Sequence, residues 1–133
     1  MNDATVAKPQ TILVVEDEVP ILHIVRTVLE MHAYRVLTAD DGDKALQLSE
    51  QHDGPIDLVI TDMNLPGISG SDMVRQLLVG RPKLHVLYVS GHFSGETQLV
   101  GGADGAMKFL SKPFTPKALL AVVGTMLASP PAG

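Results

Sequence analysis

Short apolar runs alternate with segments of helical periodicity along the chain. Thr11–Val15 reads TILVV, which is an apolar run of strand length, and residues 20–32 then place apolar side chains at the spacing of one helix face. The same alternation continues, with turn residues between the elements. Further strands are predicted at residues 34–39, 56–61, 84–90 and 106–110, and further helices at about 43–52 and 71–79.

The last two helical segments differ in how strongly the sequence favours a helix. Residues 92–105, HFSGETQLVGGADG, are rich in glycine and predict only a short fourth helix. The final helix has a clear start, with Thr115 as N-cap and Pro116 at its first position, and is predicted to run to about Ala128. Lys117 is its only charged residue, so this helix is expected either to pack on nearly all sides or to present a face to a partner.

Strands of this kind, joined by helices, indicate a parallel sheet that is buried on both faces. The predicted fold class is therefore doubly wound α/β. The length of 133 residues suits one domain, expected at residues 11–128 with tails at 1–10 and 129–133.

Composition narrows the functional classes. The formal charge of -5 and the lack of a long Lys/Arg run argue against direct nucleic-acid binding, and the absence of cysteine excludes disulfides and thiolate chemistry. No apolar stretch approaches the roughly 20 residues that a membrane helix needs. A cytoplasmic protein without membrane contact is expected.

Ligands of doubly wound sheets bind outside the carboxyl ends of the strands. The residues at the predicted strand ends are three carboxylates, a hydroxyl and an ammonium: Glu16, Asp17, Asp62, Ser90 and Lys112. Two carboxylates about 4 Å apart repel by roughly 4 kcal/mol at an effective dielectric constant near 20. Such a cluster requires a bound cation or a raised pKa, and oxygen ligands without His or Cys favour Mg²⁺.

Each of these residues taken alone also has an ordinary structural interpretation. Asp62 would be a turn or cap residue, Glu16 and Asp17 a solvated helix entry, and Lys112 an exposed charge in a trans turn. Their convergence on one edge of the sheet favours a functional site.

Four segments carry a family resemblance: ILVVEDE, DLVITDMNLPGISG, LYVSGH and FLSKPF. In order and spacing they resemble the receiver domain of two-component response regulators, over about residues 10–128. The LYVSGH and FLSKPFTPKALL segments are most similar to receivers joined to hybrid histidine kinases. The resemblance implies a flavodoxin-like five-stranded sheet of order 2-1-3-4-5 with five helices.

The resemblance also implies a phosphoacceptor function. Asp62 would take a phosphoryl group from the phosphohistidine of a histidine kinase or histidine phosphotransfer protein. Glu16 and Asp17 would position Mg²⁺ alongside Asp62, and the backbone carbonyl of Asn64 would supply a further ligand. Such a domain is not a conventional enzyme, because it catalyses only its own phosphorylation and dephosphorylation.

Other residues receive roles from the same resemblance. Ser90 and Lys112 would contact the phosphoryl oxygens, with a cis peptide bond after Lys112, and Phe109 occupies the aromatic switch position. His92, together with Asn64, would tune hydrolysis of the acyl phosphate, although an ordinary surface histidine remains an alternative. Phosphorylation would switch the surface of the fourth helix, fifth strand and last helix, where a second copy or a downstream protein would bind.

Competing functions come from other classes. A haloacid dehalogenase-type phosphatase also uses an Asp nucleophile and Mg²⁺, but that family carries a D-x-D pair after its first strand, whereas D-M-N follows the third strand here. A flavin-binding module shares the fold class, yet VVEDEVP would repel a phosphate. A receiver that only binds, or one that stores or relays phosphate without conformational output, is the nearest alternative.

Overall fold

The computed structural model describes residues 9–91 and 106–128, with side chains to residue 127. Its strands are β1 (Thr11–Val15), β2 (Arg35–Ala39), β3 (Leu58–Asp62), β4 (His85–Ser90) and β5 (Met107–Ser111). Its helices are α1 (Val19–Met31), α2 (Gly42–Gln51), α3 (Gly70–Gly80) and α4 (Pro116–Ala128). The fourth helix that the sequence predicts falls outside the described residues. The helix labelled α4 therefore corresponds to the fifth and last predicted helix.

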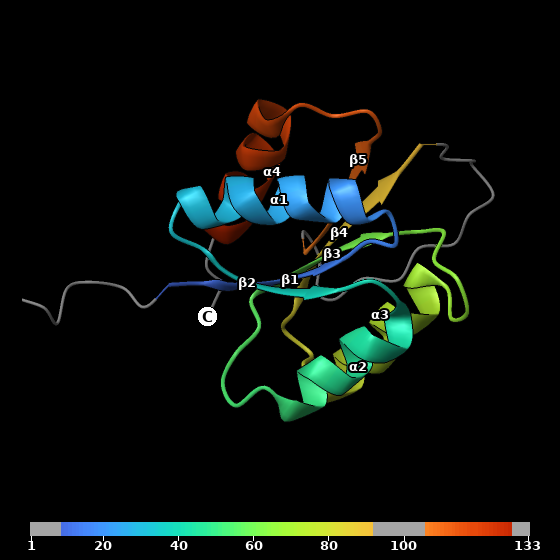
Figure 1. Cartoon of the computed structure of the whole chain (residues 1–133). Coiled ribbons are helices and arrows are strands. Elements are labelled where there is room, and N and C mark those ends of the chain that lie inside the picture. Colours follow the sequence, from blue (N-terminus) through green and yellow to red (C-terminus); the bar gives the residue numbers. More distant parts are fainter. Residues whose placement is uncertain (1–8, 92–105, 129–133) are drawn as a thin grey trace, which may run out of the picture.

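The strands form one parallel sheet of order β2-β1-β3-β4-β5. Figure 1 shows α1 and α4 on one face of this sheet and α2 and α3 on the other. The doubly wound class and the strand order are confirmed. In this register Asp62 lies opposite Val89, so the carboxyl ends of the central strands meet at one edge.

Burial of the strands on both faces holds only for the centre of the sheet. Every residue of β1 and β3 is buried, and β4 is buried from Val86 onward. The prediction is wrong for β2 and β5, where most residues are half-buried or exposed. Each of these strands lies at an edge of the sheet and has a neighbouring strand on one side only. Its other side is therefore open to solvent, unlike that of a central strand.

Side-chain caps fix where three helices begin. Asp41 accepts a hydrogen bond from the Lys44 amide at 2.8 Å at the start of α2, and Ser69 accepts one from the Asp72 amide at 3.1 Å at the start of α3. Both helices therefore begin one residue earlier than predicted. Thr115 accepts a hydrogen bond from an amide of the first turn of α4 at 3.0 Å, which confirms it as the N-cap.

The apolar character of α4 is explained mostly by core packing. Leu119, Val123 and Met126 are buried in one cluster with Val25 and Leu29 of α1. The exposed positions in the middle of the helix carry small side chains, at 121 and 125. A partner face on this helix stays a prediction. Within the described residues, no helix is both long and apolar enough to cross a membrane.

Candidate functional site

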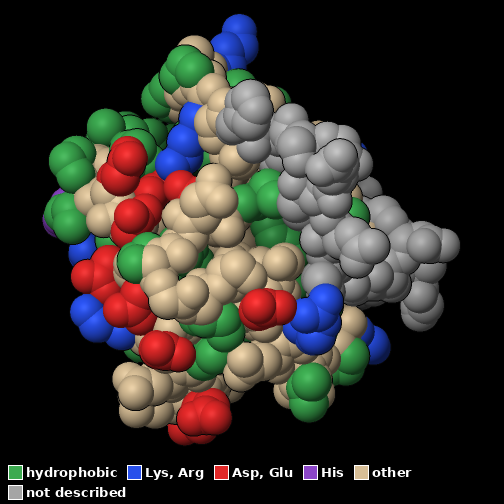
Figure 2. Space-filling model, turned by 90° about the vertical axis from the view of Figure 1, so that its right-hand side faces the viewer, with side chains coloured by type: hydrophobic (Ala, Val, Ile, Leu, Met, Phe, Trp, Pro, Cys, Tyr) green, Lys and Arg blue, Asp and Glu red, His purple; other side chains and the backbone are tan. Residues whose placement is uncertain are grey.

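The candidate site lies at the carboxyl edge of the sheet. Figure 2 faces this edge and shows acidic side chains gathered on part of its surface. Glu16 follows β1 directly and Asp62 ends β3, and their exposed fractions are only 4% and 9%. These two carboxylates therefore sit largely away from water and need specific partners.

Lys112 connects the two buried carboxylates. Its Nζ lies 2.7 Å from Oδ2 of Asp62 and 2.8 Å from Oε1 of Glu16. The lysine is held to the end of β4, because its backbone N–H donates to the Ser90 carbonyl at 2.8 Å. The Lys112–Pro113 peptide bond is cis, as the resemblance implied.

The remaining oxygens of the two carboxylates accept backbone hydrogen bonds. Oε2 of Glu16 accepts from the Glu18 amide at 3.1 Å, and Oδ1 of Asp62 accepts from the Asn64 amide at 2.9 Å. Each carboxylate is thus fixed by the Lys112 ammonium on one oxygen and by a local amide on the other. This arrangement sets the orientation of both groups.

Asp17 completes an acidic cluster with Glu16 and Asp62. One carboxylate oxygen from each residue lies within 4.8 Å of the others, and Asp17 is exposed to solvent. The donor set contains only carboxylate oxygens, which are the ligands that Mg²⁺ prefers. The cluster therefore fits a hard divalent cation.

Burial and hydrogen bonding shift the pKa values of the site residues in opposite directions. Burial raises the pKa of Glu16, while the hydrogen bonds from Lys112 and the Glu18 amide act in the opposite direction without cancelling it. For Lys112, burial lowers the pKa, but the hydrogen bonds to Asp62 and Glu16 outweigh burial and the pKa is raised. Lys112 is therefore held in its charged form.

The other predicted site residues have different surroundings. Ser90 ends β4 and is 1% exposed, whereas the Asn64 side chain is exposed. Phe109 on β5 is 46% exposed, and its ring stacks on Tyr88 with centroids 6.4 Å apart. His92 lies outside the described residues.

Sequence reasoning missed two features of the site. It assigned Lys112 to the phosphoryl group and did not foresee its bond to Glu16, although two acids at neighbouring strand ends were a signal that one cation would serve both. It also missed the backbone amides of Glu18 and Asn64, because an amide carries no residue-specific signal.

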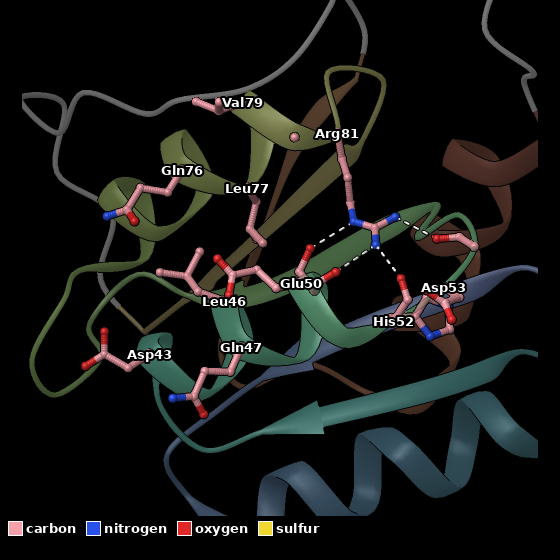
Figure 3. A pocket seen from close by; sticks show the side chains of 13 residues that line it. Asp43, Leu46, Gln47, Glu50, His52, Asp53, Gln76, Leu77, Val79 and Arg81 are labelled. Atoms are coloured by element: carbon pink, nitrogen blue, oxygen red, sulfur yellow. Dashed lines mark hydrogen bonds between the residues drawn. The ribbon is translucent and has the colours of Figure 1, made fainter.

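A separate hollow of about 930 Å³ lies between α2 and α3 (Figure 3). Arg81 follows α3 there, and its guanidinium donates to the side chain and carbonyl of Ser49 at 2.8 and 2.9 Å. It also donates to the carbonyls of Gly54 at 2.8 Å and His52 at 3.1 Å. Arg81 thereby satisfies acceptors at and beyond the end of α2, which is a structural role.

Comparison with known proteins decides the family. The family model for the response regulator receiver domain matches residues 12–124. The chain belongs to this family. It is 33% identical over 118 residues to the response regulator GtcR of Aneurinibacillus migulanus, covering 89% of this chain and 48% of that protein. It is 30% identical over 110 residues to the cell cycle response regulator CtrA of Brucella ovis, covering 83% and 47%.

Solved structures agree with the family assignment. The receiver domain of the hybrid histidine kinase CckA has a TM-score of 0.76 at 32% identity and covers 88% of this chain and 98% of that chain. A CheY-like receiver domain protein from Methanospirillum hungatei JF-1 has a TM-score of 0.80 at 28% identity, covering 90% and 94%. The chain spans about half the length of the curated relatives it matches.

Family membership places the chain among signalling domains and not in a classical enzyme family. Receiver domains interact with histidine kinases or phosphotransfer proteins and bind Mg²⁺ at an acidic pocket. The alternatives weighed from the sequence, a haloacid dehalogenase-type phosphatase and a phosphate store without output, are not favoured.

Proposed function

We propose that Asp62 accepts a phosphoryl group from the phosphohistidine of a histidine kinase or phosphotransfer protein, and that residues 11–128 form the receiver domain, with tails at 1–10 and 129–133. One observation carries the proposal. Asp62 is a buried carboxylate at the end of a central strand, with its two oxygens fixed by Lys112 at 2.7 Å and the Asn64 amide at 2.9 Å. The domain promotes its own phosphorylation by this positioning, and also its own dephosphorylation.

The chemistry follows from the fixed carboxylate. An oxygen of Asp62 forms the new bond to phosphorus while the P–N bond of the phosphohistidine breaks, giving an acyl phosphate. Lys112 already contacts Asp62 and Glu16 before the reaction. Its ammonium is therefore already close enough to pair with the negatively charged phosphoryl oxygens during the transfer.

The acidic cluster supplies the ligands for a divalent cation. Glu16, Asp17, Asp62 and the backbone carbonyl of Asn64 would hold Mg²⁺. The ion would neutralise charge on the phosphoryl oxygens, as metal ions do in phosphoryl transfer. Glu16 and Asp62 are suited to this role because their orientations are set by hydrogen bonds to Lys112 and to backbone amides.

The switch residues connect the site to the β5 side of the sheet. Ser90 and Lys112 would move toward the phosphoryl group, and Phe109, which is exposed in this structure, would turn inward against the end of β4. The expected result is a shift in population at the surface that includes β5 and α4, where a partner or second copy would bind. Asn64, together with His92, would tune hydrolysis of the acyl phosphate.

The test is incubation with acetyl phosphate and Mg²⁺ followed by intact mass measurement. The parent should gain one phosphoryl mass, and Asp62→Asn should gain none. Asp72→Asn is a matched control, because this aspartate is exposed on α3 and its side chain pairs with the surface residue Arg75. A stable phosphoryl mass on Asp62→Asn would overturn the proposal.

A further inference from the structure

Gly42 occupies the first position of α2 and is buried, although glycine is a poor helix former. The reason lies in the adjoining loop between β3 and α3. A Cβ atom at position 42 would overlap the Cγ2 methyl of Ile68. Ile68 therefore lies where the side chain of any other residue at position 42 would begin.

Ile68 has little freedom to give way. Its Cγ2 methyl is attached directly to Cβ, and β-branched side chains are restricted at χ1. The side chain also packs against the core cluster between the sheet and α2 and α3. A side chain at position 42 would consequently displace the backbone of the loop at residues 63–69, and not only a flexible side-chain end.

The far end of this loop is equally tight. At Gly70 an added Cβ would lie 2.5 Å from the carbonyl oxygen of Asp62 and 3.2 Å from Cα of Met63. The Gly70 amide donates to the Met63 carbonyl at 3.2 Å. The loop is thus held against the backbone of Asp62 by α3 and against α2 by Ile68.

We propose that the contact between Gly42 and Ile68 positions the loop at residues 63–69 for Mg²⁺ binding and phosphorylation. The Asn64 amide in this loop donates to Oδ1 of Asp62 at 2.9 Å, so a displaced loop changes the orientation of that carboxylate. The inference rests on the proposed function, which assigns the Asn64 carbonyl and Asp62 to the metal. Gly42 touches no reacting atom and acts as a positioning residue.

Mg²⁺ affinity without any phosphodonor provides the test, measured by isothermal titration calorimetry. Gly42→Ala should weaken Mg²⁺ binding by roughly tenfold, the lower end of the effect of losing an outer-shell support. Gly80→Ala is the matched control, because an added Cβ there would meet no heavy atom of the described residues within 4 Å apart from its chain neighbours and its own helix backbone. Circular dichroism establishes that each variant is folded.

Two double variants separate loop positioning from general destabilisation. Ile68→Leu removes the branching methyl that occupies the space beside Gly42, whereas Ile68→Val keeps it. Gly42→Ala with Ile68→Leu should recover most of the Mg²⁺ affinity, and Gly42→Ala with Ile68→Val should not. Normal affinity in Gly42→Ala, or equal behaviour of the two double variants, would overturn the inference.

The outcomes distinguish this inference from the proposed function. If the parent binds Mg²⁺ and is phosphorylated while Gly42→Ala matches it, only the inference fails. If the parent gains no phosphoryl mass, the proposed function fails first. Should Gly42→Ala not fold, Ile68→Ala replaces it: loss of the methyl contact should weaken Mg²⁺ binding, and unchanged affinity in that variant would overturn the inference.

Discussion

Lys112 and Arg81 are two partly buried cations with opposite kinds of partners. The Lys112 ammonium contacts two carboxylates, those of Asp62 and Glu16. The Arg81 guanidinium contacts the hydroxyl and carbonyl of Ser49 and the carbonyls of two further residues, all of them neutral. One cation sits among excess negative charge, and the other among uncharged acceptors.

This difference separates a functional site from a structural bond. Arg81 satisfies backbone carbonyls, and nothing in its contacts requires a second cation. At Lys112 the acidic cluster of Glu16, Asp17 and Asp62 carries more negative charge than one ammonium neutralises. The charge imbalance suits the carboxyl edge of the sheet to a divalent cation, and under the proposed function Mg²⁺ held there would offset the negative charge of an incoming phosphoryl group.

Replacing Lys112 should have the largest effect. Lys112→Met leaves Glu16 and Asp62 without their cation and should lower the free energy of unfolding in metal-free buffer by roughly 3 kcal/mol. The phosphorylation rate should fall by roughly a hundredfold. Urea unfolding and intact mass measure the two effects. Added Mg²⁺ should recover much of the stability. If it does not, unneutralised negative charge is not what destabilises the variant.

Replacing Arg81 should affect stability alone. Arg81→Met removes the donors to Ser49, His52 and Gly54 and should cost about 2 kcal/mol of unfolding free energy, since water can reach part of these acceptors. Phosphorylation by acetyl phosphate should proceed at the parent rate under conditions where the variant is folded. A large loss of phosphorylation in folded Arg81→Met would show that Arg81 also supports the site and does not have a structural role alone.

Glu16→Gln should make the Lys112 site resemble the Arg81 site. The amide oxygen still accepts from Lys112, while the NH2 group loses the hydrogen bond from the Glu18 amide. This loss is offset because the cost of burying a charged Glu16, which raises its pKa, disappears. The unfolding free energy in metal-free buffer should stay within about 1 kcal/mol of the parent. Mg²⁺ affinity, measured by calorimetry, should fall by roughly tenfold. A strong loss of stability with unchanged Mg²⁺ affinity would contradict this account.

The exposed pair of Lys44 and Asp40 should give the smallest effect. Lys44 Nζ lies 2.8 Å from Oδ1 of Asp40. Its hydrogen bond lowers the pKa of Asp40 below the ordinary value of 3.8. A lowered pKa of an acid gives stability that is present above pH 3.8 and is lost as the pH falls through the folded-state pKa. Lys44→Met should therefore be slightly less stable than the parent at pH 7, with a difference that disappears in acid. Urea unfolding at both pH values checks this, and a constant difference would contradict it.

The sequence predicted the class of the fold because its signals are local or periodic. The TILVV run and the pairing of Thr115 with Pro116 needed no tertiary information, and both elements are confirmed. The lower burial of β2 and β5 was missed, because composition does not reveal which strand lies at an edge. Strand order came from the family resemblance, and it is confirmed.

The site was predictable only as far as side chains identify it. Glu16, Asp17 and Asp62 follow apolar runs, and the structure brings their carboxylates within 4.8 Å of one another. The contact of Gly42 with Ile68 joins segments far apart in sequence and depends on the absence of a side chain, so no motif announces it. The Asn64 amide that fixes Asp62 was missed because every residue except proline has a backbone amide, so its position carries no sequence signal.

The position of the phosphoryl group is the sharpest test of whether Asp62 is the phosphoacceptor. After incubation with acetyl phosphate and Mg²⁺, proteolysis and tandem mass spectrometry of the parent should place a single phosphoryl group on Asp62, with none when Mg²⁺ is chelated. A phosphoryl group on Asp17 or on another residue, or one that forms equally without Mg²⁺, would contradict the account.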